Sequence, residues 1–267
     1  MKQMKRMDSH DITAMKGVEK IACLTAYSTP MARLLDEAGL HLLLVGDSVG
    51  TTELGYSSTI PVTLEDMLRH TAAVVRGTSH AMVVADLPFM AYQVSMEQAL
   101  SNCGRMLQET GCNAVKIEGG EFRAPVIRAL VQNGIPVCAH IGLTPQSQQV
   151  LGHRVQGRGE AAAKQMLADA RAVAEAGAFA VVLECIPTDL GKAITEAISI
   201  PTIGIGAGPH CDGQILVLHD ILGLGGSVHP KFAKLYADVA GQVRTAAAIY
   251  KAEVQSSAYP GPEHQYS

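Results

Sequence analysis

The chain has 267 residues, of which 48% are hydrophobic and 17% are charged, and its formal net charge is −4. This composition predicts a folded protein with a large apolar core and excludes a disordered chain. The slightly negative charge, the absence of a basic stripe and an aromatic content of 4% argue against nucleic acid as a partner. No apolar run approaches the roughly 20 residues that a membrane-spanning helix needs, so we expect no membrane partner.

The N-terminus and the cysteines indicate the compartment. The N-terminal sequence MKQMKRMDSHD is basic but lacks the apolar stretch of a signal peptide, and Asp8 and Asp11 fit a transit peptide poorly. Six cysteines are scattered through apolar segments without a C-x-x-C pair. That pattern is typical of reduced core residues rather than of disulfides or a metal site. We therefore expect a cytoplasmic protein.

Short apolar runs alternate with amphipathic stretches along the chain. The runs predicted as strands are 21–25, 42–45, 81–85, 114–117, 136–139, 179–183 and 201–205, with a candidate eighth at 215–218. Helices are predicted at 30–38, 64–76 (after the N-cap Thr63), 96–111 (after the N-cap Ser95), 121–133, 160–176, 188–198 and 231–253. A polar loop at 142–159, an N-terminal tail (1–20) and a C-terminal tail (259–267) complete the prediction.

Strands that are almost wholly apolar and alternate with helices predict a parallel sheet covered by helices. Seven clear strands and a candidate eighth suit an α/β fold of the (β/α)8 TIM-barrel type, with a single domain over residues 21–258. The stretch 209–214 is shorter than the dozen or so residues of a usual parallel crossover. An open doubly wound sheet is therefore the alternative fold.

Polar side chains follow the predicted strands, starting with the stretch LLLVGDSVG at 42–50. In chain order these residues are Asp47 and Ser48, Asp86, Lys116 and Glu118, His140, and Glu184. The carboxyl ends of barrel strands meet at one mouth, where barrel enzymes place their active sites. We therefore expect these residues, distant in sequence, to become neighbours.

Asp47, Asp86 and Glu118 form a donor set made only of carboxylates. Like charges crowded at one mouth favour a bound cation, and hard oxygen ligands suit Mg²⁺, which usually takes one or two direct carboxylates. We expect Asp47 and Asp86 to bind the metal directly and Glu118 to act through water. The alternative is that each acid caps a following helix or turn.

Glu184 follows an apolar strand and is flanked by Cys185 and Ile186. Apolar surroundings tune a carboxylate toward the neutral range in which a general base works, whereas the alternative is an ion pair with Lys116. Lys116 could bind a substrate carboxylate, form a Schiff base or neutralise the acids. His140 could donate to a bound anion or be an ordinary core histidine. Together a metal, a base and a cation suit enolisation of a 2-oxo acid.

Long segments at these positions resemble the ketopantoate hydroxymethyltransferase family. Among them are LTAY, LLLVGDSVG, GYSSTIPVTLEDMLRHT, VVADLPFMAYQ, VKIEGG, HIGLTPQS, VLECIP, IPTIGIGAG and YPGPEH, in order over residues 21–264. The resemblance implies a Mg²⁺-dependent barrel of the phosphoenolpyruvate/pyruvate type. It also implies transfer of a hydroxymethyl group from 5,10-methylenetetrahydrofolate to 3-methyl-2-oxobutanoate, which gives 2-dehydropantoate in pantothenate biosynthesis, and a homodecameric assembly.

Carried over by position, the resemblance assigns a role to each polar residue at the strand ends. It implies metal binding by Asp47, Asp86 and Glu118, substrate binding by Asp47, Ser48, Asp86, Lys116 and His140, and proton abstraction by Glu184. Under this assignment Lys116 is an anion contact and not a Schiff-base former.

Two positions depart from the family pattern. Ser28 stands where an aspartate is usual, and the loop with Gly152-His153-Arg154-Val155 is one residue shorter than usual. The first departure affects a local hydrogen bond, and the second affects folate handling or loop closure. The alternative activities are a metal-dependent 2-oxo acid lyase or aldolase of the same barrel class, and a catalytically silent barrel that binds a folate or a partner protein.

Overall fold

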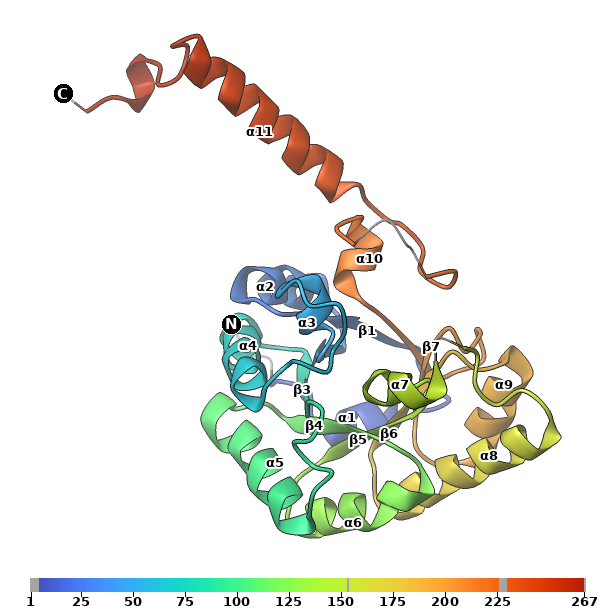
Figure 1. The fold of residues 1–267 in the computed structure, drawn as a ribbon. Helices are drawn as coiled ribbons and strands as arrows, with labels where there is room; N and C mark the ends of the chain where they lie inside the picture. The colour runs from blue at the N-terminus through green and yellow to red at the C-terminus, as the bar shows by residue number, and fades with distance from the viewer. Residues whose placement is uncertain (1–4, 153, 226–229, 267) are drawn as a thin grey trace. The chain divides into compact units, whose positions relative to one another are not determined.

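The computed structural model describes residues 5–152, 154–225 and 230–266. Eight parallel strands close into a barrel in chain order, with β8 paired to β1 (Figure 1). The strands are β1 (Ile21–Thr25), β2 (Leu42–Val45), β3 (Met82–Asp86), β4 (Ala114–Glu118), β5 (Val137–Gly142), β6 (Ala180–Glu184), β7 (Thr202–Ile205) and β8 (Gly213–Leu216). The closed barrel confirms the predicted fold and excludes the open sheet.

The short connection between β7 and β8 was the reason for considering an open sheet. In the structure β7 and β8 are each four residues long and pair in parallel, with no helix in residues 206–212. A strand of that length rises only about 13 Å. Residues 206–212 can span that distance when extended, so no crossover helix is needed between β7 and β8.

Helices surround the barrel close to their predicted positions. The longer ones are α2 (Thr29–Glu37), α4 (Leu64–Gly77), α5 (Met96–Thr110), α6 (Ala124–Gln132), α8 (Glu160–Glu175) and α9 (Thr188–Ala197). The predicted N-caps are confirmed, because Thr63 and Asp66 form a capping box for α4 and the Ser95 hydroxyl accepts from the amide of Gln98. No helix within the described residues is long and apolar enough to cross a membrane.

Short helical turns occupy segments that were not predicted as helices, namely α3 (Val49–Thr52), the 3-10 turn η2 (Pro145–Ser147) and α7 (Gln148–Leu151). The helix predicted over 121–133 begins with the 3-10 turn η1 (Glu121–Arg123) and continues as α6. All follow the carboxyl ends of strands, and they shape the mouth of the barrel. A four-residue turn is too short to show a helical hydrophobic period, so the sequence pattern did not reveal them.

The predicted N-terminal tail contains a helix, α1 (Ser9–Ala14), which begins with a capping box at Asp8 and Asp11. Ile12 is completely buried. The Thr13 hydroxyl donates to the carbonyl oxygen of Phe179 at 3.3 Å, just before β6. Lys16 Nζ donates to Asp212 Oδ2 at 2.8 Å, just before β8. The segment therefore packs against the amino-terminal end of the barrel, opposite the mouth.

The chain divides into two compact units, Met1–Val217 and Leu218–Ser267. All barrel strands lie in the first unit, whereas the predicted barrel domain extended to residue 258. The second unit contains α10 (Leu218–Leu222), α11 (Val239–Gln255) and the 3-10 turn η3 (Pro262–His264). The helix predicted over 231–253 begins later, at Val239, because Asp238 caps it by accepting a hydrogen bond from the amide of Gly241 at 2.8 Å.

We predict that Ile12→Ala lowers the free energy of unfolding by about 2–5 kcal/mol, the usual cost of a cavity in a packed core. Urea denaturation followed by circular dichroism measures this loss. Val18→Ala is the matched control, since Val18 is 82% exposed, and it should change stability by less than about 0.5 kcal/mol. A loss for Ile12→Ala as small as that of the control would show that α1 is not part of the folded barrel.

Candidate active site

The predicted polar residues gather at the carboxyl ends of β2 to β6. Asp47, Asp86, Lys116, Glu118 and His140 are all buried, with exposures of 1–4%. The Glu184 side chain is 16% exposed, which makes it the most accessible of the four carboxylates. Lys116 and Glu118 are two residues apart on β4, so both side chains point to the same side of the sheet.

The Lys116 ammonium is the positive centre of the site. Its Nζ donates to both Asp86 oxygens at 2.7 Å and lies 3.7 Å from Glu118 Oε1. Burial alone would lower the pKa of Lys116, but the carboxylates of Asp86 and Glu118 outweigh burial and raise it. Lys116 therefore stays charged, which suits an anion contact and disfavours the neutral amine that a Schiff base requires. Lys116 pairs with Asp86, and not with Glu184 as the alternative had it.

Asp47 and Asp86 are direct neighbours across the mouth. The backbone amide of Asp47 donates to Asp86 Oδ2 at 3.3 Å. Burial, together with the negative charge of Asp86, raises the pKa of Asp47 to about 7. Burial also raises the pKa of Glu118 well above its usual value. Lys116 is the only buried cation among these residues. The buried carboxyl groups therefore outnumber the positive charges beside them.

His140 connects the two acids on either side of it. Its Nε2 lies 3.2 Å from Glu184 Oε2 and its Nδ1 lies 3.7 Å from Glu118 Oε1. Burial first, and the charge of Lys116 second, lower the pKa of His140. The imidazole is therefore held neutral between two carboxylates, where it can orient Glu184 without carrying a charge.

Ser48 lies at the rim of the site, at the start of α3. Its hydroxyl is 2.7 Å from the hydroxyl of Tyr27, which is buried. Ser28, the first departure from the family pattern, occupies the N-cap position of α2 and makes no side-chain capping bond. The usual aspartate there would supply such a bond. In the shortened loop, His153 lies outside the described residues.

The sequence prediction missed Gln146, which lies in the predicted polar loop. Its side-chain amide donates to Asp47 Oδ2 at 3.0 Å and to the carbonyl oxygen of Leu87 at 2.8 Å, and it accepts from the Tyr92 hydroxyl at 2.8 Å. Its backbone amide donates to Glu118 Oε2 at 3.1 Å. Gln146 is only 5% exposed and thus fixes two of the three acids at once. Only its burial identifies it, and polarity alone predicts a solvated loop.

The donor chemistry of the site fits a hard cation, although its present arrangement is not a three-ligand cage. Within residues 5–152, 154–225 and 230–266, no group of three or more His, Cys, Asp or Glu side chains could hold a metal ion. However, Glu118 Oε1 is buried without a hydrogen-bond partner, and the Asp47 carboxyl has a raised pKa. Both conditions are relieved by a nearby cation. Two direct carboxylates, with water in the remaining positions, suffice for Mg²⁺.

The chain matches the family model described as ketopantoate hydroxymethyltransferase over residues 6–262. It belongs to this family. The 3-methyl-2-oxobutanoate hydroxymethyltransferase of Syntrophus aciditrophicus is 54% identical over 252 residues, which cover 94% of this chain and 93% of the relative. The enzyme of the same name from Moorella thermoacetica is 52% identical over 268 residues and covers both chains fully. These matches confirm the predicted family and the prediction of an enzyme.

Solved structures confirm the type of barrel. A 2,3-dimethylmalate lyase of the PEP mutase/isocitrate lyase superfamily aligns with a TM-score of 0.60 at 16% identity, over 97% of this chain and 91% of that one. A phosphoenolpyruvate phosphomutase from Streptomyces platensis subsp. rosaceus aligns with a TM-score of 0.62 at 14% identity, over 94% and 88%. At such low identities, these two alignments show only that this chain shares the fold of the solved structures.

We predict that Gln146→Met weakens Mg²⁺ binding about 10- to 100-fold, the usual effect of removing a residue that orients metal ligands. Methionine nearly fills the space but leaves Asp47 Oδ2 and the Tyr92 hydroxyl without their partner. Isothermal titration calorimetry with Mg²⁺ measures the dissociation constant directly. The control Gln149→Met changes an exposed neighbour and should bind as the wild type does. Equal affinity in both variants would remove Gln146 from the site.

We also predict that the metal-free protein loses stability as the pH rises from about 4 to about 7. Asp47 has a pKa of about 7 in the folded chain against 3.8 ordinarily, so between these values the folded chain holds a proton that the unfolded chain has lost, and this stabilisation disappears as the pH rises to about 7. Glu118 acts in the same direction. His140, with its lowered pKa, acts in the opposite direction but only as the pH falls below about 6.5.

Differential scanning fluorimetry in the presence of EDTA measures this dependence as a fall in melting temperature. The control is Asp47→Asn, in which the neutral amide has no proton to lose, so its melting temperature should fall less over the same window. A flat wild-type profile between these pH values would contradict the prediction.

Proposed function

We propose that this chain transfers a hydroxymethyl group from 5,10-methylenetetrahydrofolate to 3-methyl-2-oxobutanoate, giving 2-dehydropantoate and tetrahydrofolate in pantothenate biosynthesis. Family membership supports the activity. The observation that carries the chemistry is one connected set of buried polar groups, in which Asp47 contacts Asp86, Asp86 contacts Lys116, and Lys116 and His140 both lie near Glu118. Glu184 completes the set through His140.

Each residue has a role that follows from its position. Asp47 and Asp86 would hold Mg²⁺ directly and Glu118 through water, and the ion would polarise the carbonyl of the 2-oxo acid as a Lewis acid. The charged Lys116 binds the substrate carboxylate or its developing negative charge. Ser48 presents its hydroxyl and neighbouring backbone to the same carboxylate.

Glu184 is the proposed base. It is the most accessible carboxylate of the set, and its Oε2 lies 3.2 Å from His140 Nε2. Glu184 removes the hydrogen from the carbon beside the carbonyl, and the electron pair of that C–H bond forms the enolate. The folate methylene carbon is bonded to two nitrogens, and both of these C–N bonds break. Water gives its oxygen to that carbon and its two hydrogens to the two nitrogens, which releases tetrahydrofolate and a one-carbon aldehyde. The enolate carbon bonds to the aldehyde carbon, and the aldehyde oxygen takes the proton that Glu184 removed.

The assembly and the compartment are further parts of the proposal. The family resemblance supports a homodecamer, and the sequence composition supports a cytoplasmic enzyme without nucleic acid or membrane partners. The second unit, with α11, is the segment in which an assembly contact has most room, since α11 has no buried residue. Analytical ultracentrifugation measures the assembly state.

Hydrogen exchange without folate isolates the first half of the reaction. We predict that the protein with Mg²⁺ exchanges the C3 hydrogen of 3-methyl-2-oxobutanoate in heavy water, followed by proton NMR. EDTA should abolish the exchange. Glu184→Gln should slow it at least about 100-fold, because the amide cannot accept the proton. Glu196→Gln, on the exposed face of α9, is the control and should exchange normally.

Retained exchange in Glu184→Gln would contradict the base assignment. Product analysis with and without 5,10-methylenetetrahydrofolate tests the transfer itself. Formation of smaller fragments from a 2-oxo acid without any folate would favour the lyase or aldolase alternative. A chain with no exchange and no turnover, although folded, would be the silent barrel.

A further inference from the structure

A cavity of about 450 Å³ opens beside the active site. It lies between residues after β4, residues after β5 and the first half of α8, and the lining that matters here is Phe122, Ile141, Gly142, Met166 and Asp169. Its volume is within the range of roughly 300–1,000 Å³ that small-molecule pockets occupy. None of the residues assigned above to the 2-oxo acid or to the metal lines it.

The cavity and the active site share backbone. Gly142 lines the cavity and is the β-strand partner of Glu184, and a Cβ at Gly142 would stand 2.2 Å from the carbonyl oxygen of Glu184. The next residue, Leu143, donates its amide to that same oxygen at 2.8 Å. The cavity therefore borders the strand end that carries Glu184, the proposed base.

The walls of the cavity suit a flat heteroaromatic ring. Ile141 and Met166 are buried apolar side chains, and the Phe122 ring at the rim is 70% exposed. An exposed aromatic ring beside an apolar slot can stack on a flat ligand. Arg123 lies over the Phe122 ring at 5.1 Å, which helps to hold the ring in place.

Asp169 gives the cavity a polar end. Its Oδ1 accepts from the amide of Glu121 at 2.9 Å and from Gln165 Nε2 at 3.3 Å. In the described part of the chain, both of the hydrogen bonds to this carboxylate reach Oδ1, and Oδ2 accepts none. A ligand edge with neighbouring N–H and NH₂ donors would bond to that oxygen.

We propose that this cavity binds the bicyclic ring of the folate, with its amino-amide edge on Asp169 and its flat face against Phe122. The inference rests on the proposed function, which requires a one-carbon donor next to Glu184. The ring system carries such an edge and is apolar on both faces. The carboxylated tail of the folate leaves toward solvent past Val150, which is 83% exposed.

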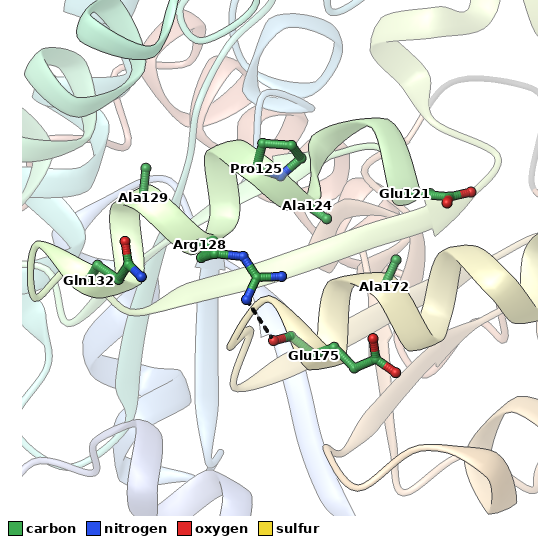
Figure 2. A pocket seen from close by; sticks show the side chains of 8 residues that line it. All are labelled: Glu121, Ala124, Pro125, Arg128, Ala129, Gln132, Ala172 and Glu175. Carbon is green, nitrogen blue, oxygen red and sulfur yellow. Dashed lines mark hydrogen bonds between the residues drawn. The ribbon is translucent and has the colours of Figure 1, made fainter.

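A second cavity of similar volume, about 420 Å³, does not share these features (Figure 2). It lies between α6 and α8, where Arg128 Nη1 donates to the carbonyl oxygen of Glu175 at 3.5 Å. No strand residue lines it. It therefore has no connection to the base and serves as the control site.

The experiment compares two tryptophan substitutions on the same helix. Ala162→Trp fills the proposed folate cavity and Ala172→Trp fills the second cavity, each from a lining position on α8. Asp169→Asn is the conservative variant, because the amide keeps Oδ1 as an acceptor but replaces Oδ2 with a donor. The readouts are the KM for 5,10-methylenetetrahydrofolate, the Kd for tetrahydrofolate by calorimetry, and folate-independent hydrogen exchange of 3-methyl-2-oxobutanoate.

Ala162→Trp and Asp169→Asn should each raise the KM and the Kd about 10-fold or more, the factor expected when a charge-assisted hydrogen bond is lost. Hydrogen exchange should stay within about 2-fold of the wild type, since the 2-oxo acid site is untouched. Ala172→Trp should alter none of the three. Unchanged folate constants in both Ala162→Trp and Asp169→Asn, or exchange that falls together with them, would overturn the cavity assignment alone. A wild-type protein without exchange would overturn the proposed function and this inference with it.

Discussion

The mouth of this barrel depends on one unbalanced electrostatic arrangement. Three buried carboxylates, Asp47, Asp86 and Glu118, surround the single ammonium of Lys116. Removing charges from water costs several kcal/mol for each ion, and one cation cannot compensate three anions. The raised pKa values of Asp47 and Glu118 are the direct result. Such a site favours a proton or a divalent cation.

The imbalance persists because neighbouring groups fix the acids in place. Gln146 reaches from the loop after β5 to Asp47 and Glu118, and the Tyr92 hydroxyl both accepts from the Glu118 amide and donates to Gln146. Each of these groups is buried, so an unmade hydrogen bond would be costly. The network thus holds the carboxylates at short range despite their repulsion. Asp47, Tyr92 and Gln146 come from the segments after three different strands and Glu118 from the end of β4, so the arrangement exists only when the barrel is closed.

The two ends of the barrel have different roles. At the amino-terminal end, α1 buries Ile12, and Lys16 pairs with Asp212, whose Oδ2 also accepts from Thr202 at the start of β7. These contacts concern stability. At the carboxyl end, the strand ends and the short turns after them carry the acids, including the proposed base Glu184, and border the neighbouring cavity. This division lets the loops vary around a rigid set of strands, as in other barrels of this type.

The amino-acid sequence alone predicted the strands and the barrel, which the structure confirms, and it predicted the polar residues that the structure brings together at the mouth. Apolar runs mark the strands because both faces of a parallel sheet are buried, and the polar residue after each run had to lie at the mouth once the barrel closed. The family segments are the basis for the roles that we propose for Asp47, Asp86 and Glu184. Tertiary structure decided what period and polarity do not encode. Burial of Gln146 and of Ile12 shows that Gln146 is part of the site and that α1 belongs to the barrel. The hydrogen bonds of Lys116 show that its partner is Asp86. The physical reason is that these contacts join residues far apart in the chain, and their partners are defined only after the fold has brought them together.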